Sequence, residues 1–156
     1  MLTKSDLLRR LSDRIGEERR GPAVLVVDDD ASITRLCGLV LERAGFVVET
    51  ASDGRSALEK IEKNDYAAIL LDLQMPFMHG ATLLALLGRD KPALLKKLVV
   101  MTALPEAALA DIHGVVASVL RKPMTDGDVI HAVRRCIDPS IMPTEIGDRT
   151  ARAQIR

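Results

Sequence analysis

Short apolar runs alternate with amphipathic stretches between residues 23 and 137, and this alternation constrains the fold more than any other feature. Five apolar runs predict strands, at Ala23–Val27, Phe46–Thr50, Ala67–Leu71, Leu98–Met101 and Val115–Leu120. Helices are predicted after them, at 31–44, 54–63, 80–89, 105–112 and 125–137. Three of the runs are almost wholly apolar, as strands covered by helices on both faces must be. Strict alternation of five β-α units predicts an α/β fold with a doubly wound, five-stranded parallel sheet and right-handed crossovers.

The segments that flank this core follow different patterns. Residues 1–22 are predicted to be an N-terminal extension, and within it residues 2–20 predict a charged amphipathic helix. Its apolar side chains at helical spacing are Leu7, Leu8, Leu11 and Ile15. Residues 23–138 are the predicted domain, and residues 139–156, which have two prolines and no periodicity, are predicted to be a flexible tail. The extra helix is either solvated and loosely packed on the domain or a segment that dimerises or docks a partner.

Composition favours a cytoplasmic protein and excludes several classes of function. The 22 basic and 22 acidic side chains balance, so no strongly basic face for nucleic acid is expected, and we expect no direct DNA binding. No run approaches the roughly 18–20 apolar residues of a membrane span, and the N-terminus lacks the apolar region of a secretion signal. Cys37 and Cys136 lack metal or redox spacing and are expected to be buried thiols in a reducing compartment.

Side chains that suit ion and phosphate chemistry follow four of the predicted strands. They are Asp28, Asp29 and Asp30 after the first strand, Asp72 after the third, Thr102 after the fourth and Lys122 after the fifth. Taken alone, each is ordinary, since an aspartate run after a strand is most often a helix cap. The carboxyl ends of parallel strands share one edge of the sheet, however, and ligands bind there. The joint pattern therefore predicts a single site.

Crowded carboxylates in a folded protein need a cation or shared protons. Mg²⁺ is the expected cation, because it prefers oxygen ligands and keeps waters that leave room for a phosphoryl oxygen, whereas zinc would favour His or Cys. Lys122 and Thr102 offer an ammonium group and a hydroxyl to a phosphoryl group. A carboxylate is a competent nucleophile for phosphoryl transfer when the developing charge is stabilised, which makes Asp72 a candidate for an aspartyl phosphate.

The segments VLVVDDD, LLDLQMPFMHG, VVMTA and RKP, in this order, resemble the receiver domains of two-component response regulators over roughly residues 23–136. The resemblance implies a flavodoxin-like sheet of strand order 2-1-3-4-5 in a stand-alone, single-domain regulator. It also implies a magnesium site in which Asp29 binds the ion directly and Asp28 mostly through water. By the same resemblance Asp72 is the phosphorylated residue and a further metal ligand, and the backbone carbonyl of Gln74 completes the shell.

Further roles follow from the same resemblance. Thr102 would follow the phosphoryl group and Lys122 would pair with it, with a cis peptide bond before Pro123. Asp30 is expected to cap the first helix of the domain rather than to bind metal. The family usually has an aromatic residue three positions before its lysine, where this chain has Val119, so the signal is expected to be relayed differently. The stretch between Thr102 and Lys122 is also slightly short, which would trim the fourth helix or the loop after it.

Residues beside the main site are expected to have smaller effects. Three are expected to modulate the phosphorylated state or its relay: Gln74, Leu104 and Val119. The histidines are expected to be surface or helix-packing residues without catalytic or metal-binding roles: His79, His113 and His131.

These features predict a switch rather than a turnover enzyme. A sensor histidine kinase or a histidine phosphotransfer protein would donate a phosphoryl group to Asp72 in a Mg²⁺-dependent reaction. The output would be contact with a downstream protein target, homodimerisation, or service as a phosphate relay. Two alternatives remain. A pseudo-receiver adaptor would keep the fold and act without phosphorylation, and an aspartate-dependent phosphatase would need a second acid where this chain has Gln74.

Overall fold

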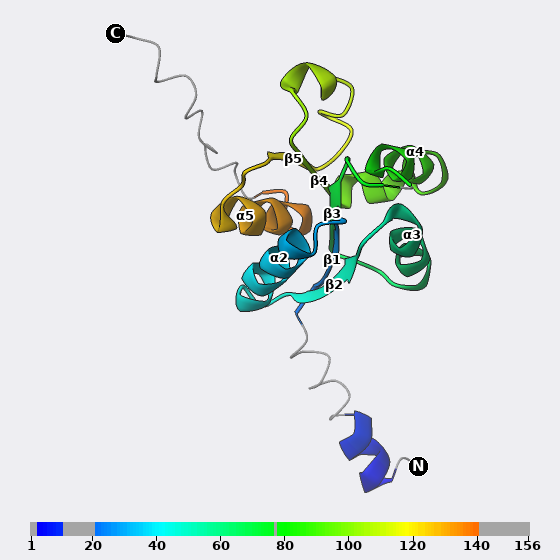
Figure 1. Cartoon of the computed structure of the whole chain (residues 1–156). Helices are drawn as coiled ribbons and strands as arrows, with labels where there is room; N and C mark the ends of the chain where they lie inside the picture. The colour runs from blue at the N-terminus through cyan, green and yellow to red at the C-terminus, as the bar shows by residue number, and fades with distance from the viewer. Residues whose placement is uncertain (1–2, 11–20, 77, 141–156) are drawn as a thin grey trace.

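A five-stranded, all-parallel sheet forms the centre of the computed structural model, which describes residues 3–10, 21–76 and 78–140 (Figure 1). The strand order is β2-β1-β3-β4-β5, so the predicted fold class and order are confirmed. The strands are β1 (Ala23–Val27), β2 (Val47–Ala51), β3 (Ala68–Asp72), β4 (Leu98–Thr102) and β5 (Ser118–Arg121). Every residue of the central strands β3 and β4 is buried, which explains why these runs are apolar on both faces of the pleat.

Helices cover both faces of the sheet, as the alternation predicts (Figure 1). Helices α2 (Ala31–Arg43) and α5 (Asp126–Ile137) lie on one face, and α3 (Gly54–Lys63) and α4 (Gly80–Asp90) lie on the other. Successive strand residues point to opposite faces and therefore build two separate apolar cores. Leu25, for example, packs on the side of α3 and α4, whereas Val26 packs on the side of α2 and α5.

Side chains in the turns before three helices fix where those helices begin. The carboxylate of Asp30 accepts a hydrogen bond from the Ser32 N–H at 2.8 Å, so the expectation that Asp30 caps the first helix of the domain is confirmed. Asp53 caps α3 in the same way. Thr125 and Asp128 form a capping box at the start of α5. These caps hold the loops at the carboxyl ends of the strands in defined conformations.

The prediction of an α-helix at 105–112 is wrong. The structure has a short 3-10 helix, η2 (Glu106–Ala108), followed by turns up to the start of β5, which begins later than predicted. A 3-10 turn rises about 2.0 Å per residue against about 1.5 Å in an α-helix, so a short segment covers more distance when wound in this way. The segment 103–117 is slightly short, as noted from its sequence, and Gly114 has a φ of 83° that an α-helix does not allow.

The segment 103–117 still covers the sheet, because its apolar side chains enter the core beneath it. Leu109 is fully buried, and Leu104, Ile112 and Val116 pack around the same cluster. A second short 3-10 helix that the sequence patterns did not predict, η1 (Pro92–Lys97), links α4 to β4. Ala117 donates to the carbonyl of Leu98 at 2.9 Å and so attaches the end of the segment to the start of β4.

The terminal segments are described only in part. Residues 4–10 are helical, which agrees with the first part of the predicted helix, while Leu11, Ile15 and the rest of it lie outside the described residues. Most of the predicted tail, residues 141–156, also lies outside them. Within the described ranges, every helix is too short or too polar to cross a membrane.

Leu109 allows a test of the segment that replaces the predicted helix. Leu109→Ala should lower the free energy of unfolding by about 2–5 kcal/mol, because it leaves a cavity at a fully buried position. Val115→Ala is the matched control, since Val115 lies in the same segment with 48% of its surface exposed, and it should change stability by no more than about 0.5 kcal/mol. Urea unfolding followed by circular dichroism measures both. Equal effects would show that the segment is not part of the core.

Candidate functional site

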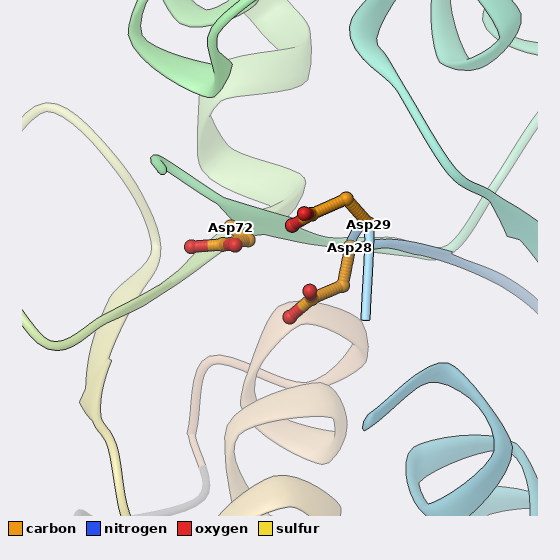
Figure 2. Close-up of side chains that lie close together, drawn as sticks. All are labelled: Asp28, Asp29 and Asp72. Carbon is orange, nitrogen blue, oxygen red and sulfur yellow. The ribbon is translucent and has the colours of Figure 1, made fainter. Parts of the chain in front are cut away.

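Three aspartates meet at the carboxyl edge of the sheet (Figure 2). Asp28 and Asp29 follow β1, and Asp72 is the last residue of the neighbouring strand β3. One carboxylate oxygen of each residue lies within 4.8 Å of the others. Asp28 is 1% and Asp72 3% exposed, whereas Asp29 faces solvent. The parallel topology therefore brings together carboxylates that are more than 40 positions apart in the chain.

Lys122 brings a positive charge to these carboxylates. Its Nζ donates to Asp28 Oδ2 at 2.9 Å and lies 3.5 Å from Asp72 Oδ2. The Lys122–Pro123 peptide bond is cis, as the resemblance implied. Lys122 follows β5, which is separated from β1 by β3 and β4, so its side chain reaches across the edge of the sheet to Asp28.

Three side chains at the strand ends accept a hydrogen bond from the backbone N–H two residues further along the chain. Asp28 Oδ1 accepts from the N–H of Asp30 at 2.9 Å, and Asp72 Oδ1 accepts from the N–H of Gln74 at 3.1 Å. The hydroxyl of Thr102, the last residue of β4, accepts from the N–H two positions further on at 3.0 Å. Each side chain therefore closes a turn on its own backbone and is held where its strand stops.

Thr102 lies at the same edge of the sheet, but within the described residues its side chain has no hydrogen bond to Asp28, Asp29 or Asp72. In the register of β3 and β4, Asp72 lies opposite Met101, so Thr102 is one residue beyond this pair. It is fully buried, and its hydroxyl is engaged with the backbone of Leu104. Leu104 itself is partly buried against the core that contains Leu109.

The surroundings of Asp72 disfavour its ionised form, because its carboxyl group is buried and Asp28 is already a buried carboxylate beside it. Burial raises the pKa of Asp72, and the neighbouring Asp28 carboxylate adds to this, while the hydrogen bond from Gln74 and the charge of Lys122 oppose it. For Lys122, burial favours the neutral form, but the bond to Asp28 and the charges of Asp28 and Asp72 outweigh it and raise its pKa. One ammonium group thus faces three carboxylates, which leaves negative charge for a cation to neutralise.

The donor set suits a hard divalent cation. Carboxylate oxygens from Asp28, Asp29 and Asp72 are the ligand type that Mg²⁺ prefers, and the exposed position of Asp29 leaves one side of the group open to water. Gln74, predicted to add its backbone carbonyl, lies in the turn that its own N–H closes on Asp72. These residues fit a magnesium ion.

A glycine that the sequence patterns did not single out shapes the same site. A Cβ atom on Gly80, the first residue of α4, would overlap the backbone carbonyl of Asp72. Glycine therefore lets the N-terminus of α4 approach the end of β3, where the partial positive charge of a helix N-terminus favours an anion. Its place in the quoted segment LLDLQMPFMHG was the only signal in the sequence, because the close approach depends on tertiary structure.

The remaining predicted residues lie around the site or away from it. His79 is exposed at the start of α4, and the structure records no capping bond from its side chain. His113 contacts Glu106 at 2.6 Å, and Glu106 also accepts from Arg121 at 3.1 Å. This cluster, which the sequence patterns did not predict, ties the segment 103–117 to β5. His131 is half-buried on α5.

Val119 lies on the face of β5 that packs toward the segment 103–117. Its partner in the register is Val100, and both belong to the core that contains Leu109. Val119 therefore lies in the core beneath the segment 103–117 rather than beside the carboxylates.

Comparison with known proteins agrees with this geometry. A family profile described as "Response regulator receiver domain" matches residues 24–134, within the predicted domain 23–138. The chain belongs to the response-regulator receiver family. Receiver domains are the signal-accepting switches of two-component systems.

Individual relatives support this assignment. The receiver domain of the Francisella response regulator 1452 superposes with a TM-score of 0.70 at 27% identity, covering 76% of this chain and 98% of that one. Transcription factor SKN7 of Saccharomyces cerevisiae is 44% identical over 64 residues, which are 41% of this chain and 10% of SKN7. Transcriptional regulatory protein SrrA of Staphylococcus aureus is 47% identical over 57 residues, which are 36% of this chain and 24% of SrrA. The match thus spans about a quarter or less of these curated relatives.

The raised pKa of Asp72 predicts how stability depends on pH without metal. Folding favours the protonated form of Asp72, so its contribution to stability is present below the ordinary pKa of 3.8 and is lost as pH rises through the higher folded-state pKa. Asp72→Asn should therefore be more stable than the parent chain at pH 7 in a chelating buffer, and this difference should vanish below pH 3.8.

Urea midpoints at several pH values measure this effect. Asp65→Asn is the control, because Asp65 is an exposed carboxylate that precedes β3, at the opposite end of the strand from Asp72. This substitution should leave the urea midpoint nearly unchanged at every pH. A lower midpoint for Asp72→Asn than for the parent chain at pH 7 would contradict the prediction.

Proposed function

We propose that this receiver domain is a phosphorelay switch that accepts a phosphoryl group on Asp72. The observation that carries the proposal is the position of Asp72, buried at a strand end beside two other carboxylates and 3.5 Å from the ammonium group of Lys122. Membership of the receiver family supports the same role. The donor would be the phosphohistidine of a sensor histidine kinase or of a histidine phosphotransfer protein, and the switch would act in the cytoplasm.

In the proposed reaction, a carboxylate oxygen of Asp72 attacks the phosphorus atom of the phosphohistidine. A P–O bond forms as the P–N bond breaks, and the imidazole nitrogen keeps the bonding electron pair and takes up a proton. Asp28, Asp29, Asp72 and the carbonyl of Gln74 would hold Mg²⁺. The bound ion would neutralise charge on the phosphoryl oxygens.

Two side chains would stabilise the product. Lys122 already lies beside Asp28 and Asp72, so a small movement would bring its Nζ to a phosphoryl oxygen. The Thr102 hydroxyl accepts from the N–H of Leu104 and keeps its own proton, which it can donate to another phosphoryl oxygen. Because Leu104 is the second residue of the segment 103–117, a shift of Thr102 would move the start of that segment.

We propose that this movement produces the output. The start of the segment 103–117 is tied to β4 through the bond from Leu104 to Thr102 and to β5 through the ion pair of Glu106 with Arg121, so this part of the segment would respond to a change at either residue. A surface segment that switched between two conformations would change a protein contact without an aromatic residue at position 119, where this chain has Val119. The partner would be a downstream protein or a second copy of the chain. We expect no direct DNA binding by this domain.

One observation favours a second function. The segment between β4 and β5 lacks an α-helix, and Val119 has no ring to reorient, which suits an adaptor that keeps one conformation. Such a pseudo-receiver would bind its partner without phosphorylation.

Labelling with acetyl phosphate and Mg²⁺ separates these functions. The parent chain and the exposed-site control Asp65→Asn should take up one phosphoryl group, which EDTA prevents, while Asp72→Asn should remain at background. Equal labelling of Asp72→Asn would refute the assignment of the acceptor. Lack of labelling in the parent chain would favour the adaptor, and steady turnover of a small phosphoester would favour a phosphatase.

Lys122→Gln should slow labelling by roughly 10²-fold, the usual effect of removing one group that stabilises the transition state. The same variant should bind Mg²⁺ more tightly, because the ammonium group that competes for Asp28 and Asp72 is gone. Lys63→Gln, at an exposed position of α3, is the control and should change neither quantity. Labelling reactions quenched at successive times give the rate, and calorimetry gives the affinity for Mg²⁺. An unchanged labelling rate would exclude the proposed role of Lys122 in phosphoryl transfer.

A further inference from the structure

A largely apolar groove lies between α2 and α5, next to the site but separate from it. Its volume is about 450 Å³, and the loop from β5 to α5 closes one end. The apolar lining consists of Ile33, Leu36, Cys37, Val40, Met124 and Val129. Leu36 is 52% exposed and Leu39, one turn further along α2, is 48% exposed. We refer to this surface as the α2–α5 groove. Contiguous exposed apolar surface of this kind commonly marks a binding site.

The N-terminal helix at residues 4–10 has an apolar side that is equally uncovered. Leu7 is 53% and Leu8 58% exposed. The helix begins with a reciprocal cap, in which Thr3 N–H donates to the Asp6 carboxylate and Asp6 N–H donates to the Thr3 hydroxyl. An isolated helix shorter than about 12–15 residues is only marginally stable in water. Burial of its leucines would supply the stabilisation that the cap alone does not.

Charge also matches the helix to the groove. The helix carries Lys4, Arg9 and Arg10 against the single acid Asp6. The edge of the sheet beside the groove is acidic, with exposed carboxylates on Asp29, Asp30 and Asp126 in addition to the buried ones. The one lysine that lines the groove, Lys122, is already paired with Asp28. Opposite charges at the rim would orient the helix and speed its encounter with the groove.

The chain is long enough for the contact to form within one molecule. Residues 11–20 can span at most roughly 36 Å, whatever their conformation. Gly21 lies two residues before β1, and α2, with 13 residues, is about 20 Å long, so the helix can reach the first turns of α2 from the opposite edge of the sheet. A tether of this length gives an effective concentration in the millimolar range, which favours the intramolecular contact over one between copies.

We propose that the helix at residues 4–10 docks into the α2–α5 groove of its own chain. Leu7 and Leu8 pack on the apolar lining, and Arg9 and Arg10 face the acidic edge. In the structure described above these leucines are exposed, so the docked form is a second conformation in equilibrium with this one. The docked helix would cover the loop that carries Lys122 and thereby limit the approach of large partners to that edge. The contact does not depend on phosphorylation of Asp72.

Paramagnetic broadening in NMR spectra of the full chain tests the proposal. A nitroxide is attached to Ser5→Cys, an exposed position of the helix. The native thiols react more slowly than an exposed cysteine at pH 7, because Cys37 is buried, Cys136 is half-buried and burial raises the pKa of each to about 11. Amide signals of α2 and of the loop before α5 should be broadened, whereas signals of α3 and α4 on the opposite face should not. Absence of broadening around the groove would overturn the proposal.

Two controls make the result specific. Leu36→Asp should abolish the broadening by placing a charge on the apolar lining, while Val115→Asp, at an equally exposed apolar position elsewhere, should preserve it. In a mixture of isotope-labelled parent chain with unlabelled spin-labelled chain, broadening should be absent. Broadening in that mixture would show docking between copies and would overturn the intramolecular contact, as would broadening that survives Leu36→Asp.

Discussion

The ion pair between Lys122 and Asp28 is the contact on which the rest of the site depends. Burying a carboxylate without a partner costs several kcal/mol, and Asp28 is almost wholly buried. The pair joins the ends of β1 and β5, which are not neighbours, so its 2.9 Å geometry requires β3 and β4 to lie between them in register. One lysine does not balance three carboxylates. The same arrangement that permits the fold therefore leaves negative charge that a bound cation or a proton on Asp72 can neutralise, and this links the architecture of the sheet to metal binding and to pH.

Precision at the site comes from local turns as much as from packing. Asp28, Asp72 and Thr102 each accept a backbone N–H from two residues further along, so each side chain is held by its own strand end. This arrangement holds the side chains of Asp72 and Thr102 in place and leaves Asp29 exposed on the side of the site that faces solvent. Preorganisation of this kind lowers the reorganisation needed when charge develops. It also explains how a small domain with few aromatic residues can hold a polar site at the edge of an apolar sheet.

Much of the fold was predictable because two regularities coincide along the chain. Buried parallel strands must be apolar on both faces, and the polar residues that end them must share one edge, so the runs and strand-end residues together predicted the sheet and the grouping of Asp28, Asp29, Asp72 and Lys122. The segment 105–112 was mispredicted because Leu109, Ile112 and Val116 have helical spacing, which 3-10 turns also satisfy over a short distance. The role of Gly80 and the bonds of Glu106 depend on tertiary contacts that no local pattern contains.

The absence of an α-helix between β4 and β5 in the described structure changes how such a switch could transmit its state. A rigid helix would move as one body, whereas the segment 103–117 is held at separate points. These include the bond from Leu104 to Thr102, the ion pair of Glu106 with Arg121, the buried side chain of Leu109 and the bond from Ala117 to Leu98. Exposed ion pairs contribute about 0–1 kcal/mol, so the attachment at Glu106 is weaker than the one made by the buried side chain of Leu109. In the function we propose, a displacement of Thr102 would therefore move Leu104 and the weakly held Glu106, while Leu109 stays anchored in the core. Val119 packs against the same core as Leu109, and its compact side chain would let that core stay intact while the start of the segment moves.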